Sequence, residues 1–137
     1  ISVNPEQTIV TAAVLMLKHR ISGLPVVDAE GQFLGIITEG VIFKVLVDFS
    51  GISLGTTVLA VRLEDRPASI KEAADAIREH DGRLASILTS YASADPGFRK
   101  VYFRIRDLPS QTLQAMREGL EKRFELLYVS EDKVDMS

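Results

Sequence analysis

Residues 22–38 read Ser-Gly-Leu-Pro-Val-Val-Asp-Ala-Glu-Gly-Gln-Phe-Leu-Gly-Ile-Ile-Thr, and this stretch decides the fold of the first part of the 137-residue chain. Its apolar and β-branched residues form two short runs, 24–27 and 33–37, which favour strands. Between the runs, Asp28 can bond its own backbone and Gly31 tolerates a positive φ, as turns require. The short gap predicts an antiparallel hairpin. Gly35 interrupts the second run and predicts a close approach by another backbone or a ligand.

Helices are expected on both sides of this hairpin. Residues 4–8 predict a helix start, and residues 9–20 then carry apolar side chains at the spacing of one helical face. Residues 41–48 are predicted to form a second short amphipathic helix. With a strand before the first helix, the predicted unit has the order β-α-β-β-α.

This unit resembles a CBS domain, a regulatory module that usually works in pairs. The resemblance covers residues 1–49 and rests on Val-Asn-Pro at 3–5, Ala-Ala at 12–13 with Met16, the run 21–28, Gly31, and Gly-Ile-Ile-Thr at 35–38. It implies that an adenine nucleotide (AMP, ATP or S-adenosylmethionine) lies in the cleft between two paired domains. The residues implied to hold it are Val3, Ile21, Ser22, Gly23, Leu24 and Pro25, with Thr38 at the phosphate.

Two further features bear on that site. Val41 stands where the family places an Asp that holds the ribose hydroxyls, and valine cannot accept a hydrogen bond. Lys18, His19 and Arg20 are either phosphate contacts or an ordinary cationic helix end. The resemblance also implies that the partner CBS domain, expected upstream, is absent from this chain.

The second half of the chain restarts the pattern after a Ser- and Gly-rich linker, expected at residues 50–55. Residues 56–131 predict the order βαββαβ, the ferredoxin-like arrangement of an α+β protein. Ser69 is expected to cap the first helix of this half, paired with Glu72 in a capping box. Gly82 is expected to end that helix in a left-handed conformation. The predicted strands cover 57–63, 84–91, 98–105 and 124–129, and the predicted helices cover 70–80 and 109–123.

This second half resembles an ACT domain, a small regulatory module that often binds amino acids at dimer interfaces. The resemblance rests on Glu-Asp-Arg-Pro at 64–67, on apolar positions of the following helix, and on residues 82–87. It implies a small effector near Asp65, Arg66, Pro67 and Ala68, where Ala68 replaces the family's common Gly. A CBS unit followed by an ACT unit is similar to proteins of the acetoin-utilisation B type. Residues 132–137 are expected to be an acidic, solubilising tail.

Composition excludes several classes of function. The net charge of −3 gives no attraction for phosphate backbones, so no nucleic-acid partner is expected. The absence of cysteine excludes disulfides, thiol chemistry and Cys-ligated metal. No apolar run reaches the roughly 20 residues that span a bilayer, and no signal peptide is visible. We therefore expect a cytoplasmic protein without membrane insertion.

Catalytic signals are missing from the sequence. There is neither a Walker-type phosphate loop nor a nucleophile elbow. His19 and His80 each fall at a predicted helix end, where a cation is favourable without any chemistry. Lys100, Arg104 and Arg106 are expected on a solvated sheet face. We therefore assign no catalytic residue, no metal ligand and no required cofactor.

Two functional hypotheses remain. The first is a non-enzymatic regulatory, ligand-sensing protein that binds an adenine nucleotide in the first half and a small effector in the second. The alternative is a ligand-free module for oligomerisation or for docking on a partner enzyme or transporter, which Val41 and Ala68 favour. Either hypothesis predicts a homodimer, because the first half leaves an apolar helix face uncovered.

Overall fold

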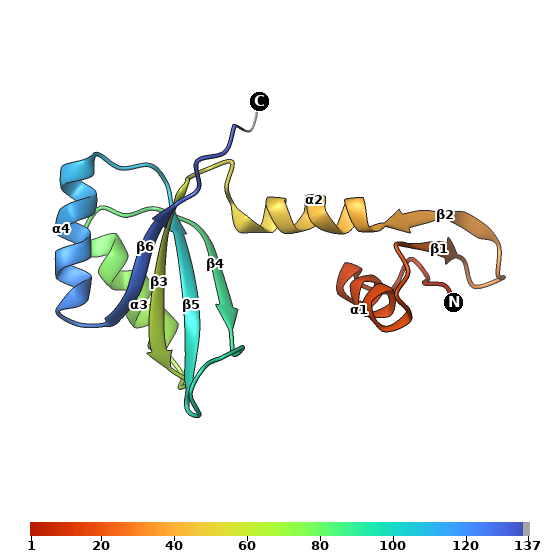
Figure 1. Ribbon diagram of the computed structural model, residues 1–137, viewed down its shortest axis with the longest axis horizontal. Coiled ribbons are helices and arrows are strands. Elements are labelled where there is room, and N and C mark those ends of the chain that lie inside the picture. The colour runs from red at the N-terminus through yellow and green to blue at the C-terminus, as the bar shows by residue number, and fades with distance from the viewer. Residues whose placement is uncertain (136–137) are drawn as a thin grey trace. The chain divides into compact units, whose positions relative to one another are not determined.

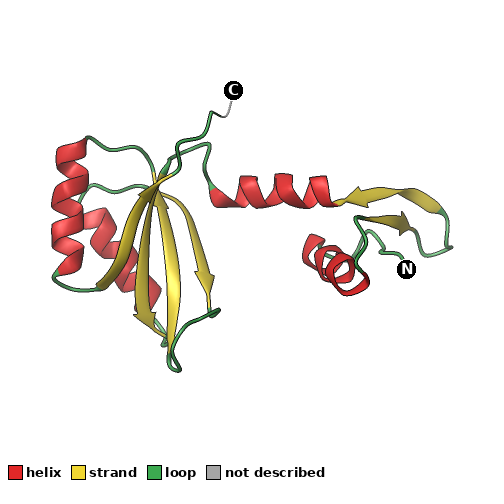
Figure 2. Cartoon of the chain, in the orientation of Figure 1, coloured by secondary structure: helices red, strands yellow, loops and turns green. Residues whose placement is uncertain are grey.

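A computed structural model describes residues 1–135, and the chain divides into two compact units, Ile1–Val47 and Asp48–Ser137. The prediction of an α+β protein is confirmed, since helices alternate with antiparallel hairpins and sheets throughout (Figures 1 and 2). The boundary between the units falls inside helix α2 (Glu39–Ser50). That helix reaches the first residue of the predicted linker, and the last two residues of the predicted tail, 136–137, lie outside the described part.

The first unit is built around the predicted hairpin. Strand β1 (Gly23–Val27) pairs antiparallel with β2 (Phe33–Thr38). The turn uses the chemistry that its sequence indicates: Oδ1 of Asp28 accepts from the amides of Glu30 at 3.0 Å and Gln32 at 2.8 Å. Gly31 adopts a φ of 80°. The two strands are therefore joined by local hydrogen bonds that need no help from the rest of the chain.

The structure defines three predicted features of this unit more closely. The first strand is reduced to one parallel bridge between Val3 and Val26, because the chain leaves the sheet again at once. Helix α1 (Ile9–His19) is capped by Thr8, whose Oγ1 accepts from the amide of Thr11 at 3.3 Å, so the helix begins at the end of the predicted start segment 4–8. No other backbone approaches Gly35, since a Cβ there would meet no described atom within 4 Å, and the approach of a ligand stays a prediction.

The core of the first unit is small. Its fully buried residues are Val3, Ala12, Met16 and Leu24. Helix α2 has no fully buried residue although its sequence is largely apolar. On α1, Val10, Val14 and Leu17 are 63%, 54% and 80% exposed and share one face.

The second unit has the predicted ferredoxin-like topology. Its four strands form one antiparallel sheet in the order β4-β5-β3-β6, and helices α3 and α4 cover one face of it (Figure 1). The elements are β3 (Thr57–Glu64), α3 (Ser69–Glu79), β4 (Leu84–Ser90), β5 (Phe98–Ile105), α4 (Ser110–Glu121) and β6 (Glu125–Glu131).

Its core forms where the alternating strand residues meet the helix stripes. Leu59 and Val61 on β3 pair with Phe103 and Val101 on β5, and all four are at most 2% exposed. The helix residues expected at the core spacing are buried: Ala73, Ala74 and Ile77 on α3, and Met116 and Leu120 on α4, with Leu113 packed at the edge. Helix α3 also buries Ala76 and Ser69, which the periodicity does not predict.

The ends of α3 differ from the predicted ones. Ala68, not Ser69, is the residue before the helix, and it has a left-handed backbone with φ 70° and no side-chain cap. Glu72 does not complete a capping box, because its carboxylate binds Arg66. At the other end Asp81 takes the left-handed conformation with φ 66°. Gly82 serves another purpose, since a Cβ there would lie 2.7 Å from Cε of Met116 and collide with Ile77.

Residues 50–55, the last residue of α2 and the segment after it, pack tightly within the second unit. Oγ of Ser86 donates to the carbonyl of Ser50 at 2.5 Å. A Cβ at Gly55 would collide with the carbonyl of Ile105, so only glycine fits there. Arg104 donates to the carbonyl of Gly55 at 3.2 Å and to Asp132 at 2.7 Å. Arg104 is therefore half-enclosed by this segment and is not on a solvated face as expected.

Candidate functional site

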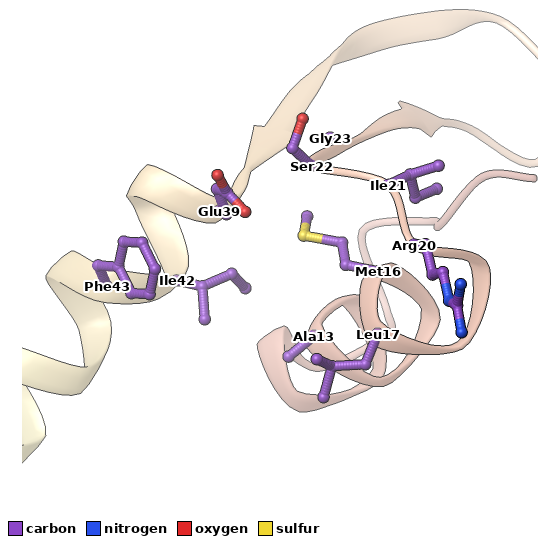
Figure 3. A pocket seen from close by; sticks show the side chains of 10 residues that line it. All are labelled: Ala13, Met16, Leu17, Arg20, Ile21, Ser22, Gly23, Glu39, Ile42 and Phe43. Carbon is purple, nitrogen blue, oxygen red and sulfur yellow. The ribbon is translucent and has the colours of Figure 1, made fainter.

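The first unit contains an apolar cavity of about 770 Å³ between α1 and the start of α2 (Figure 3). Ile42 of α2 borders it on one side, and Met16 and Leu17 of α1 border it on the other. The polar lining comes from Arg20, Ser22 and Glu39. The volume lies within the range of small-molecule sites, roughly 300–1,000 Å³, which are mostly apolar with a few polar groups.

Local backbone geometry builds this cavity. Helix α1 ends because Arg20 turns into the left-handed region, with φ 54° and ψ 47°, and its amide donates to the carbonyl of Met16. The amide of Ile21 donates to the same carbonyl at 3.0 Å. The amide of Glu39 donates to the carbonyl of Ser22 at 2.9 Å. These bonds hold the residues 20–23 beside the first turn of α2.

The predicted nucleotide residues separate into two groups. Ile21, Ser22 and Gly23 line the cavity together. Val3 and Leu24 are core residues, 3% and 0% exposed.

The remaining two predicted residues lie on the strands. The carbonyl of Pro25 accepts from the amide of Val3 at 3.0 Å, so Pro25 is part of the small sheet. Thr38 is the exposed last residue of β2 and does not line the cavity. A second depression, of about 730 Å³, is lined by residues 2–7, which include Val3, and by residues 27–30.

The cavity also contains residues that sequence reasoning did not assign to a site. Leu17 and Phe43 lie on helix faces that the periodicity treats as ordinary packing surface. Glu39 directly follows Thr38, a predicted site residue, and this adjacency in sequence could have indicated that Glu39 lies near the site. Within residues 1–135, the side chains of Arg20 and Glu39 make no hydrogen bond or ion pair in the structure, so both are available to a ligand.

In the second unit, the predicted effector residues form the turn between β3 and α3. Arg66 donates to both carboxylate oxygens of Glu72, at 3.0 and 2.6 Å, and to Glu64 at 3.1 Å. The hydrogen bond to Glu72, followed by that to Glu64, raises the pKa of Arg66 above its ordinary value. The hydrogen bond from Arg66 lowers the pKa of Glu72, so both groups stay charged at neutral pH.

The other groups of this turn are also engaged. Oη of Tyr91 donates to Asp65 at 3.1 Å, and Arg99 donates to that same hydroxyl at 3.3 Å. The carbonyl of Pro67 accepts from Arg66 at 3.2 Å. Ala68 contributes only its left-handed backbone. The turn is therefore held by its own ion pairs and hydrogen bonds.

The described part of the chain has neither a metal-binding cluster nor a membrane-spanning helix. Across residues 1–135, no group of three or more His, Cys, Asp or Glu side chains is arranged to hold a metal ion. Over the same residues, each helix is too short or too polar to cross a membrane.

Comparison with known proteins gives a match for the first unit. Residues 1–48 match the family described as the CBS domain. An uncharacterized protein of Methanocaldococcus jannaschii is 49% identical over 43 residues, which are 31% of this chain and 26% of that protein. The chain thus matches about a quarter of the length of this curated relative.

For the second unit the comparison is structural. The solution structure of the ACT domain from GTP pyrophosphokinase of Chlorobium tepidum covers 59% of this chain and 89% of its own length, at 15% identity and a TM-score of 0.41. The strand order β4-β5-β3-β6 by itself makes the second unit ferredoxin-like. The resemblance to acetoin-utilisation B type proteins stays a prediction. Residues 1–48 of the chain are therefore a match to the CBS domain family, joined to a ferredoxin-like unit.

Proposed function

We propose that this chain is a non-enzymatic regulatory protein whose first unit binds an adenine nucleotide in the cavity between α1 and α2. The observation that carries this proposal is the cavity itself, about 770 Å³, lined by Ile21, Ser22 and Gly23 from the CBS-matching segment. An adenine ring buries well against apolar side chains such as Ile42 and Phe43, while nearby backbone groups fix its orientation.

Regulation requires more than binding. A ligand changes the state of a protein only if it binds one of two states more tightly. In this proposal, the second state concerns α2, because its first turn lines the cavity and its last turn belongs to the second unit. A small effector that binds at residues 65–68 would likewise favour one of two states of the second unit. To bind there, it would have to displace the ion pairs of Arg66.

A second candidate function is assembly without a ligand. Helix α2 has no fully buried residue, and its large apolar side chains Val41, Phe43 and Leu46 are 39%, 59% and 60% exposed. The stripe of Val10, Val14 and Leu17 on α1 adds further exposed apolar surface. We propose that a second copy of this chain covers this surface in a homodimer, or that a partner enzyme or transporter does.

Calorimetric titration of the full-length protein with AMP, ATP, NADH and S-adenosylmethionine tests the binding proposal. Phe43→Ala removes a cavity residue that is 59% exposed, and Phe33→Ala is its control, 68% exposed on β2 and outside the lining. We expect one ligand to bind at micromolar concentration and to lose about tenfold in affinity in Phe43→Ala only.

The same protein distinguishes the two functions. Absence of heat with all four ligands, while sedimentation shows a dimer, would move the conclusion to the assembly function. A monomer at tens of micromolar in sedimentation would contradict the homodimer.

A further inference from the structure

We propose that Arg20 is the anion-binding residue of the cavity between α1 and α2, so that the ligand carries a phosphate or carboxylate beside its apolar ring system. This inference rests on the proposed ligand binding in the first unit and specifies which residue selects the ligand. It is carried by the backbone of Arg20, by its free guanidinium, and by the position of the cavity's other charge.

The backbone of Arg20 is in a region that arginine rarely adopts. With φ 54° and ψ 47° it occupies the left-handed position after a helix. Glycine, and to a lesser extent asparagine, is normal there, because a Cβ is crowded against the following carbonyl. The need to end α1 therefore does not explain why residue 20 is an arginine. A strained residue that lines a cavity is instead a candidate for function.

The guanidinium of Arg20 is free to meet a ligand. Arg62, Arg66 and Arg104 each donate to a carboxylate at 3.1 Å or less. Arg20 forms no such pair within the described residues, although it lines the cavity with Glu39. A favourable charge at the end of α1 is already supplied by Lys18 in the last helical turn.

The arrangement of charge sets the direction in which a ligand lies. Arg20 and Phe43 border opposite sides of the cavity, and Glu39 lies on α2 with Phe43 (Figure 3). An anionic group is repelled by Glu39 and attracted by Arg20, whose planar fork matches phosphate and carboxylate. The anion therefore lies at the α1 side and the ring at the α2 side.

The test compares AMP with adenosine, which share a ring system and differ in the phosphate. In the full-length protein we expect AMP to bind at least about tenfold more tightly than adenosine. In Arg20→Gly this preference should disappear while adenosine binding is unchanged, and Arg20→Lys should retain part of it, since lysine keeps the charge without the fork.

The stability of the same variants separates function from folding. Arg20→Gly should raise the melting temperature of the first unit by roughly 4 °C, because glycine relieves the left-handed strain. Asp81→Gly is the matched control: it relieves a φ of 66° at the end of α3, far along the chain, and should leave AMP affinity unchanged. Equal loss of AMP binding in both variants would overturn the inference.

A titration with inorganic phosphate tests Arg20 without requiring an adenine site. The amide NMR signals of residues 20–23 monitor the binding. Shifts in the wild type that vanish in Arg20→Gly support Arg20 even if neither AMP nor adenosine binds, which would refute the adenine proposal alone. AMP binding that Arg20→Gly does not weaken would overturn the role of Arg20 and leave the proposed function standing. Absence of both AMP binding and phosphate shifts would refute both.

Discussion

The substitution Ala68→Gly is expected to stabilise the second unit. Ala68 is exposed and has φ 70°, a conformation that an L-residue adopts only at a cost of about 1–2 kcal/mol. Glycine lacks the Cβ that causes this cost, but it gives the unfolded chain more freedom, which removes part of the gain. The net gain is therefore about 1 kcal/mol, or roughly 4–8 °C in melting temperature for a unit of this size.

The assay is urea and thermal unfolding of the full chain, followed by circular dichroism. The control is Ala115→Gly, at an exposed position inside α4 with ordinary helical backbone. There, glycine should destabilise by about 1 kcal/mol, so the same chemical change has opposite signs at the two sites. If Ala68→Gly destabilised as much as Ala115→Gly, Ala68 would not be left-handed and Ser69 would again be the candidate cap.

Three further outcomes are expected. Ser69→Ala should be neutral or stabilising in urea unfolding, because Oγ of Ser69 is buried and has no partner among the described residues; a loss of about 1 kcal/mol would show that it caps α3 after all. Gly55→Ala should destabilise by about 1–3 kcal/mol, because the new Cβ meets the backbone of Ile105, whereas Gly35→Ala, in open space, should not; equal effects in the two variants would contradict the packing of the segment after α2. The pKa of Glu72 is lowered in the folded protein by its hydrogen bond from Arg66, so its contribution is present above its unfolded pKa of about 4.3 and is lost as pH falls through the folded pKa. Acid titration of stability should therefore be shallower in Arg66→Met than in the wild type, and an unchanged profile would show that the pair is not formed in solution.

Local chemistry explains the predictions that were confirmed. The hairpin of the first unit follows from Asp28 and Gly31, whose hydrogen bonds and φ act within a few residues. The buried stripes of α3 and α4 follow from apolar spacing, because a helix fixes which residues share a face. The sheet of the second unit follows from alternating strands and short connections.

The wrong predictions concern ends and close contacts. Ser69 has the sequence of a cap, but the capping turn bends at Ala68, and Arg66 takes the carboxylate of Glu72. Gly82 has the sequence of a left-handed helix end, but Asp81 bends first, and Gly82 is needed to clear Met116. In each case two neighbouring residues can do the same local task, and packing against a distant element selects one.

The candidate site was predicted only in part. Ile21, Ser22 and Gly23 were assigned from their likeness to the CBS family, and the structure brings them to the cavity. Glu39 and Phe43 were not assigned, because their place depends on how α2 packs beside the end of α1.

The amino-acid sequence by itself determined the element types, the hairpin, the α+β class and the order βαββαβ, since these depend on periodicity and on turn residues close along the chain. Only the tertiary structure decided that Arg20, Glu39 and Phe43 border one cavity, and that Gly55 is pressed against Ile105. The physical reason is that cavities and close backbone contacts arise between elements. Their geometry is fixed by the fit of many side chains at once, and no single stretch of sequence contains it.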